Sequence, residues 1–145
     1  MEFGLWLMDL TPKTIDNSQM DNEIFNYKKL VAYQRAKALV KLVYGLIKKF
    51  PKEEQYALCD QLRRAVVSVT SNIAEGTNRS TYPDKVRFLE MSYGSLMEVH
   101  SQMDVACDLG YISPEELSHI EELVVSIAKP LSGLRSKFQS EVHKP

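Results

Sequence analysis

The segment RRAVVSVTSNIAEGTNRS, residues Arg63 to Ser80, carries the pattern that decides the fold. Its apolar side chains recur at three- and four-residue steps, as they do on one face of an amphipathic helix. With two preceding leucines, this face comprises Leu58, Leu62, Ala65, Val66, Val69 and Ile73. Gly76 follows, and glycine most readily takes the left-handed conformation of a helix C-cap. The segment therefore predicts a helix that stops near Glu75, with Gly76 as its cap.

Another amphipathic helix, of about six turns, is predicted upstream of this segment. Between Tyr27 and Phe50 the apolar residues again recur at helical spacing, and Pro51 ends the pattern. The link from Pro51 to Glu54 is short, so we expect the two helices to be antiparallel neighbours.

A third helix is predicted after a polar loop. Ser80 or Thr81 can cap it, and Pro83 suits a first turn because its backbone angle is fixed. The apolar pattern runs to Leu109, and Gly110 follows it.

The fourth predicted helix begins at a capping box. Ser113 and Glu116 have the required spacing, and Pro114 occupies the first helical position. The apolar face continues to Phe138, although Pro130 removes a backbone donor and is expected to kink the helix.

These elements predict an all-α fold, an up-down-up-down antiparallel four-helix bundle over residues 23–142, because no strand pattern occurs in the sequence. A chain of 145 residues suits one domain. Residues 1–22 are interpreted as a disordered extension, natural or introduced for expression. Their apolar patch is too short to cross a bilayer and lacks the basic region of a secretory signal, so no membrane association is expected.

Composition favours an intracellular protein without a strong overall field. The net charge is -1, which does not mark the whole molecule as a polyanion binder. Cys59 and Cys107 form neither a metal-type pair nor a disulfide framework. This pattern fits a reducing compartment, and a cytoplasmic location is predicted.

Charge is nevertheless divided unevenly along the chain. Residues 24–52 contain no acidic residue, and residues 88–128 contain no lysine or arginine. On the first helix, Lys37, Lys41 and Lys48 fall in one narrow sector, a spacing that suits phosphates along a nucleic-acid backbone. The alternatives are a solvated helix face, or a charge match to acidic helices of the same or a neighbouring subunit.

Three arginines are further candidates for nucleic-acid contact: Arg63, Arg64 and Arg79. A planar guanidinium beside a helical core can also make fixed pairs with carboxylates, so structural pairing is the alternative role. For the first two arginines the candidate partners are Glu75, Glu90 and Glu98. Glu75 and Asn72 are expected to satisfy the backbone of the following loop or to meet Arg79.

The third predicted helix carries two neighbouring stripes, although a single-domain bundle needs only one. The second stripe includes Ser92, Ser95 and Val99, and its small residues permit close approach of another helix. We predict these three residues as the interface of a homo-oligomer. A broad surface that faces the core of the same chain is the alternative, since interfaces resemble cores in composition.

The sequence shows no constellation for catalysis, and no site for a cofactor, a metal or a small-molecule substrate is predicted. A di-iron site in a bundle requires two Glu-x-x-His pairs and two further glutamates. Only Glu116 and His119 have that spacing, and Glu116 has a capping role. His100 and Asp104 form an i, i+4 pair, but two ligands do not make a site.

Four stretches, taken in order, resemble one bacterial protein family. They are FPKEE at Phe50 to Glu54, QLRRAVVSVTSNIAEG at Gln61 to Gly76, RFLEMSYGSLMEV at Arg87 to Val99 and LGYI at Leu109 to Ile112. They resemble the four-helix-bundle family of intervening sequences in bacterial 23S ribosomal RNA genes, which also contains the accessory variability determinants of diversity-generating retroelements. Thr70, Lys85 and Pro130 depart from that family's usual residues.

The resemblance implies an up-down-up-down bundle that assembles as a homopentameric ring. It also implies, through the retroelement relatives, binding to nucleic acid and to a reverse transcriptase. The leading hypothesis is a non-enzymatic homo-oligomeric scaffold with a basic face for RNA or DNA, or for a nucleic-acid enzyme. The alternative is a purely protein-binding or structural oligomer that does not bind nucleic acid.

Overall fold

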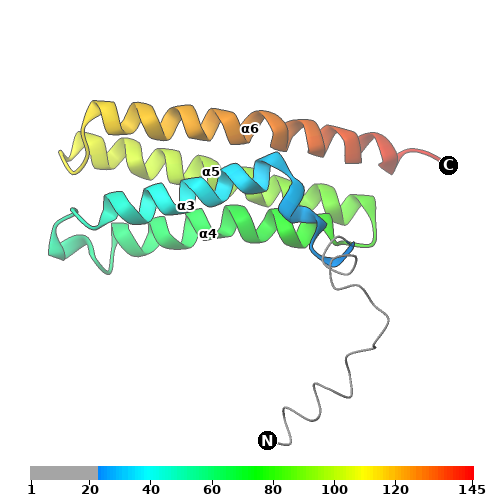
Figure 1. The fold of residues 1–145 in the computed structure, drawn as a ribbon, viewed down its shortest axis with the longest axis horizontal. Helices are drawn as coiled ribbons and strands as arrows, with labels where there is room; N and C mark the ends of the chain where they lie inside the picture. Colours follow the sequence, from blue (N-terminus) through cyan, green and yellow to red (C-terminus); the bar gives the residue numbers. More distant parts are fainter. Residues whose placement is uncertain (1–22) are drawn as a thin grey trace, which may run out of the picture.

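The computed structural model describes residues 23–145, and the extension predicted for residues 1–22 lies outside this range. The described chain is helical and contains no strand. Its α-helices are α3 (Val31–Ile47), α4 (Leu58–Thr77), α5 (Tyr82–Asp108) and α6 (Pro114–Val142), and its short 3-10 helices are η1 (Asn26–Lys29) and η2 (Lys52–Glu54). The α-helices run alternately in opposite directions, and α3 also packs against α6, which closes the bundle (Figure 1). The predicted all-α four-helix fold is confirmed.

One apolar face of each α-helix contributes to a single core. Its largest fully buried side chains include Leu39, Leu62, Ile73, Leu89, Leu96, Met103, Ile120 and Ile127. None of the described helices combines the length and apolar character that a bilayer crossing requires.

The first helix is shorter at both ends than its sequence pattern indicated. Tyr27 belongs to η1, and the extended backbone of Leu30 separates η1 from α3. The rings of Tyr27 and Tyr33 pack edge to face across this break, with their centroids 4.9 Å apart. At the other end, the N–H groups of Lys49 and Phe50 donate to carbonyls three residues back, so the last turn tightens and the helix ends.

Gly76 does not serve as the predicted left-handed cap. It is buried inside α4, which continues to Thr77, and Gly110 is the residue with positive φ (79°) in the described chain. A Cβ on Gly76 would lie 2.8 Å from the Cβ of Phe88. Glycine is therefore required here because α4 and α5 approach closely, and the prediction of a cap was wrong.

The start signals of the two later helices are confirmed. The Thr81 hydroxyl accepts a hydrogen bond from the N–H of Asp84 at 3.3 Å, at the beginning of α5. Ser113 and Glu116 form the reciprocal capping box of α6, with hydrogen bonds of 3.1 and 2.9 Å. Helix α5 ends at Asp108, one residue before the predicted end.

The residues predicted as an oligomer interface face the interior of their own chain. Ser92 and Val99 are fully buried, and the Ser92 hydroxyl donates to the Val69 carbonyl of α4 at 2.8 Å. Ser95 and Ser68 share a hydrogen bond of 2.8 Å between the same two helices. The interface prediction was therefore wrong for Ser92 and Val99, which have no surface for a second copy, whereas Ser95 is half-buried between α5 and α4.

Pro130 lies inside α6, which continues through it to Val142. Proline lacks the N–H that would bond to the carbonyl of Ser126 one turn earlier. The guanidinium of Arg35, on α3, donates to that carbonyl at 2.6 Å. A side chain of α3 thus supplies the hydrogen bond that the backbone of α6 lacks at Pro130.

Candidate nucleic-acid interface

Basic side chains of α3 and of the turn that follows it divide into two groups according to their contacts. Arg35 and Lys49 extend toward α6, where they bond to a backbone carbonyl and to a carboxylate. Lys37, Lys41 and Lys48 are exposed and form no ion pair within residues 23–145. We call these three residues the lysine row. Its positive charges are available to a ligand because no carboxylate of the described chain neutralises them.

Arg63 of α4 lies beside the last member of the lysine row. Lys48 and Arg63 both line a hollow of about 350 Å³, which we call the Tyr44 hollow. Its other lining residues are Tyr44, Ile47 and Gln55. The guanidinium of Arg63 donates to the Gln55 backbone carbonyl at 3.4 Å, a long contact that orients the group and leaves its charge uncompensated. The structure therefore brings together two of the predicted nucleic-acid-binding residues.

Tyrosines lie among these cations, and the sequence analysis did not identify them as part of the site. Tyr44 is 39% exposed, one turn before Lys48, and the Lys37 ammonium lies 5.5 Å from the centre of the Tyr33 ring. The apolar pattern of the first predicted helix includes Tyr44 but not Tyr33. A helical wheel centred on the lysines would have placed Tyr44 at the border of their sector, where it can face solvent.

The two remaining candidate arginines are engaged elsewhere. Arg64 pairs with Asp60 at 3.3 Å, so the partners predicted for it were wrong. Arg79 pairs with Glu75 at 3.8 Å, as predicted, and lies 4.2 Å from the centre of the Phe88 ring. Neither lines the Tyr44 hollow. Residues one turn apart on the same helix supply the partner of Arg64 more readily than distant glutamates do.

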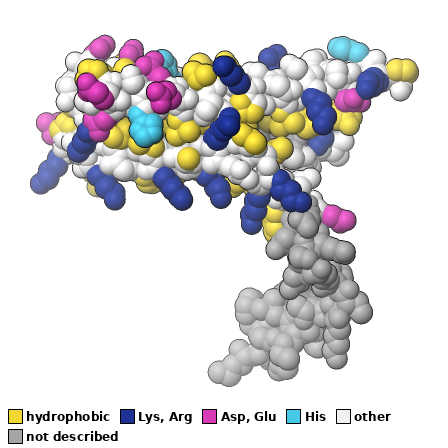
Figure 2. Space-filling model, turned by 45° about the horizontal axis from the view of Figure 1, so that its top comes forward, with side chains coloured by type: hydrophobic (Ala, Val, Ile, Leu, Met, Phe, Trp, Pro, Cys, Tyr) yellow, Lys and Arg dark blue, Asp and Glu magenta, His cyan; other side chains and the backbone are white. Residues whose placement is uncertain are grey.

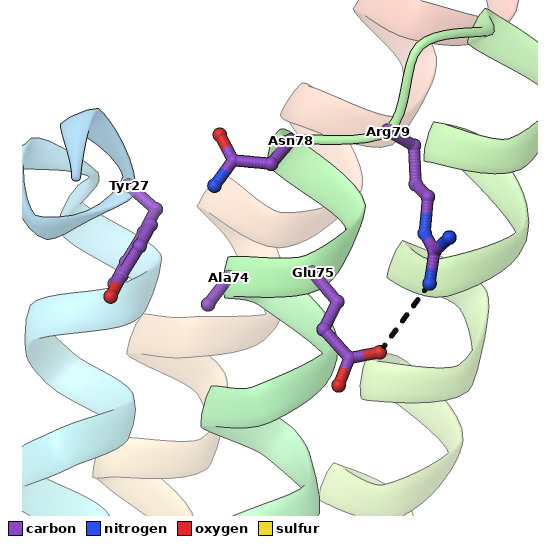
Figure 3. A pocket seen from close by; sticks show the side chains of 5 residues that line it. All are labelled: Tyr27, Ala74, Glu75, Asn78 and Arg79. Carbon is purple, nitrogen blue, oxygen red and sulfur yellow. Dashed lines mark ion pairs between the residues drawn. The ribbon is translucent and has the colours of Figure 1, made fainter. Parts of the chain in front are cut away.

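Arg79 also borders a second hollow, which Figure 3 shows at the end of α4. Its lining comprises Tyr27, Ala74, Glu75, Asn78 and Arg79, and its volume is about 350 Å³. In the view, Arg79 points toward Glu75 and away from Tyr27. The side-chain amide of Asn78 donates to the Ile24 carbonyl at 3.3 Å. The polar side chains that line this hollow thus form contacts within the chain. Asn72, which was expected to satisfy the backbone of the loop, instead donates to Ser68 within α4 and does not reach the loop.

Acidic side chains gather at the end of the molecule where α5 passes into α6, while Lys and Arg follow the lower edge in Figure 2. At the acidic end, hydrogen bonds from Lys49 and from the Ser113 backbone lower the pKa of Glu116. His100 pairs with Glu121 at 3.0 Å. Within residues 23–145, no group of three or more His, Cys, Asp or Glu side chains is placed to hold a metal ion.

Comparison with known proteins shows to which family this chain belongs. The family described as 23S rRNA-intervening sequence protein matches residues 28–133, which include the lysine row, the Tyr44 hollow and most of all four helices. The chain belongs to this family. No protein of curated function matches the chain.

A solved structure shares the fold. It is a protein of unknown function from the S23 ribosomal protein family of Bacteroides thetaiotaomicron, and it is 19% identical to this chain. The match covers 73% of this chain and 96% of the other, with a TM-score of 0.67. At this identity the similarity concerns the fold.

Lys85 and Thr70, which the sequence resemblance marks as atypical, have defined contacts in the structure. Lys85 donates to the carbonyl of Thr77 at 2.6 Å, at the C-terminal end of α4, where a cation is favourable. Burial lowers the pKa of Lys85. The Thr70 hydroxyl donates to the Val67 carbonyl at 2.7 Å within the same helix.

Proposed function

We propose that this protein is a non-enzymatic scaffold that assembles with copies of itself as a pentamer and presents α3 to RNA or DNA, or to a nucleic-acid enzyme such as a reverse transcriptase. The observation that carries this proposal is the lysine row, which is exposed and has no ion-pair partner in the described chain. Phosphates bind such rows without regard to sequence. The exposed ring of Tyr44 among the cations strengthens the case, because it offers a face on which a base stacks.

Assembly would compensate for the small size of the basic surface. A row of three lysines binds weakly by itself, and a ring presents several copies to one polymer, which raises avidity without any new contact. The resemblance to retroelement accessory proteins supports both the ring and the nucleic-acid partner. We also place the protein in the cytoplasm, because its cysteine composition suits a reducing compartment.

The outer face of α5 is our candidate surface for this assembly. Met91, Met97 and Val105 lie on it with exposed fractions of 40%, 38% and 46%. Gly94 lies among them, and the space where its Cβ would be is open. Exposed apolar side chains beside a small residue suit contact with another helix.

Binding measured against salt concentration tests the nucleic-acid partner. We expect the wild-type protein to retard structured RNA at low salt, with a log-log slope that scales with the number of phosphate contacts. Replacing Lys37, Lys41 and Lys48 with glutamine should lower that slope by about two to three units. Folding should persist because all three side chains are exposed. Wild-type protein that retards neither RNA nor DNA at low salt contradicts the proposal.

One observation favours a purely protein-binding oligomer as the second candidate. Lys49 pairs with Glu116, so the basic first helix and the acidic end of the molecule already match within one chain. A neighbouring copy could match the lysine row in the same way. In that case the triple glutamine variant should dissociate the assembly, and nucleic acid should not bind from the start.

A further inference from the structure

We infer that the Tyr44 hollow receives one unpaired nucleotide, with its base stacked on Tyr44 and its phosphate between Lys48 and Arg63, so that the protein selects single-stranded over duplex nucleic acid. This inference rests on the proposed function and adds the class of nucleic acid that is bound. It concerns the end of α3 next to the link to α4, where the lysine row meets a second helix.

The composition of the hollow suits a nucleotide more than a purely apolar ligand. Ile47 is buried and contributes an apolar wall, and the half-exposed ring of Tyr44 stands beside it. Lys48 and Arg63 bring two positive charges, and no carboxylate lines the hollow. A flat aromatic face next to two cations is the combination on which bases and phosphates of single strands bind.

Two nearby carboxylates, those of Glu54 and Asp60, are directed elsewhere. Glu54 accepts hydrogen bonds from the Leu58 N–H at 3.2 Å and from the Tyr111 hydroxyl at 3.4 Å. Asp60 pairs with Arg64. The charges of Lys48 and Arg63 therefore remain available to an anion at the hollow.

Gln55 offers a means to contact the edge of a base. Its backbone carbonyl accepts from Arg63, while its side-chain amide forms no hydrogen bond within the described residues. A free amide provides both donors and an acceptor, which every base edge can match in some orientation. The contact would hold the base without strong sequence preference.

The rest of the lysine row marks the path that a bound single strand of nucleic acid would follow from the hollow. Lys48 is the C-cap residue of α3 and lies 11 positions after Lys37, which is about 16 Å at 1.5 Å per residue, and Lys41 lies between them. The row can follow a backbone while the hollow takes a single base. A duplex cannot use the hollow without unstacking, because its base faces are covered by neighbouring bases.

Binding of matched oligonucleotides tests the inference. Fluorescence anisotropy at low salt should show tighter binding of a single strand of about 15 nucleotides than of the duplex of the same sequence. Tyr44→Leu should weaken single-strand binding about tenfold and leave the salt slope unchanged, because stacking is lost and no phosphate contact is. Tyr44→Phe should bind as the wild type does.

Tyr56 supplies the matched control. It is 93% exposed in the segment before α4 and does not line the hollow, so Tyr56→Leu should leave binding unchanged. Arg63→Gln should instead lower the salt slope by about one unit.

The failures of the two proposals are distinguishable. Equal wild-type affinity for single strand and duplex overturns the inference without any variant, as does an equal effect of Tyr44→Leu and Tyr56→Leu. In both cases the proposed function stands, because nucleic acid still binds. Wild-type protein that binds no nucleic acid overturns both proposals.

Discussion

At Gly76, the spacing between two helices depends on the absence of a side chain. Gly76→Ala would place a Cβ 2.8 Å from the Cβ of Phe88, closer than such atoms approach in proteins. Because α4 and α5 must separate to admit it, we expect the free energy of unfolding to fall by about 1–3 kcal/mol in urea titrations.

Gly45 is the matched control for this substitution. It lies in α3, and nothing lies within 4 Å of the position of its Cβ. Gly45→Ala should therefore raise the free energy of unfolding by up to about 1 kcal/mol, because alanine favours a helix more than glycine does. Equal effects of the two substitutions would contradict the role of close packing at Gly76.

Glu116 makes stability depend on pH at the acidic end of the bundle. Hydrogen bonds from Lys49 and from the Ser113 backbone lower its pKa below the ordinary 4.5. The stabilising contribution of the ionised carboxylate is therefore complete above about pH 4.5 and is lost as pH falls through the pKa of the folded state. Thermal melts between pH 7 and pH 3 should show this loss in the wild type and a smaller loss in Glu116→Gln.

Glu115→Gln provides the comparison, because Glu115 lies in the same first turn of α6 and is exposed. Both substitutions remove one negative charge near the helix N-terminus. If the two substitutions change the pH dependence of stability equally, that dependence arises from negative charge at the helix N-terminus and not from the contacts of Glu116.

At the scale of the elements, Arg35 and Pro130 form a testable pair. Arg35→Leu should lower the free energy of unfolding by about 1 kcal/mol, because the Ser126 carbonyl loses its donor. In a Pro130→Ala background the new N–H can bond to Ser126, so the same substitution should have a smaller effect. A double-mutant cycle of thermal unfolding measures the difference. Additive effects would show that Arg35 does not replace the missing backbone bond.

Helix starts were predictable from the sequence because their signals are local. The Ser113 and Glu116 capping box depends on two residues three positions apart, and it forms as predicted. The role of Gly76 was not predictable, since its reason lies in Phe88 on another helix. The start of the first helix also differed from its prediction, because the apolar pattern does not reveal that the backbone of Leu30 is extended.

The candidate site was predictable in part. Periodicity placed Lys37, Lys41 and Lys48 in one sector of the first helix, and all three are exposed on α3 and its C-cap. Lys48 and Arg63 come from different segments of the chain and meet at one hollow. A helical wheel drawn for one helix cannot show that they are neighbours. Tyr44 was missed because a tyrosine at the edge of an apolar face can point either to the core or to solvent.

At the scale of the whole molecule, the lysine row and the candidate assembly surface belong to helices that do not pack against each other. The lysine row lies on α3, whereas the exposed methionines of α5 lie on the outer face of another helix. An assembly through α5 would therefore leave the lysine row accessible on every copy. This separation allows assembly and nucleic-acid binding to be tested independently.

Met97→Glu tests assembly through the outer face of α5. Burying the new carboxylate between copies would be unfavourable, so light scattering should show the mass fall from that of several chains, five in the proposed ring, to that of one. Circular dichroism should remain helical because Met97 is exposed in the single chain.

Two further substitutions make the result specific to that face. Ser71→Glu, on an exposed position of α4, should leave the mass unchanged, whereas Ser95→Glu should unfold the chain because Ser95 packs against Ser68. Dissociated Met97→Glu protein should bind RNA more weakly, because avidity is lost while each copy keeps its lysine row. A wild-type protein that is monomeric at micromolar concentration would remove the ring, and the basic face of α3 would then have to act as a single weak site.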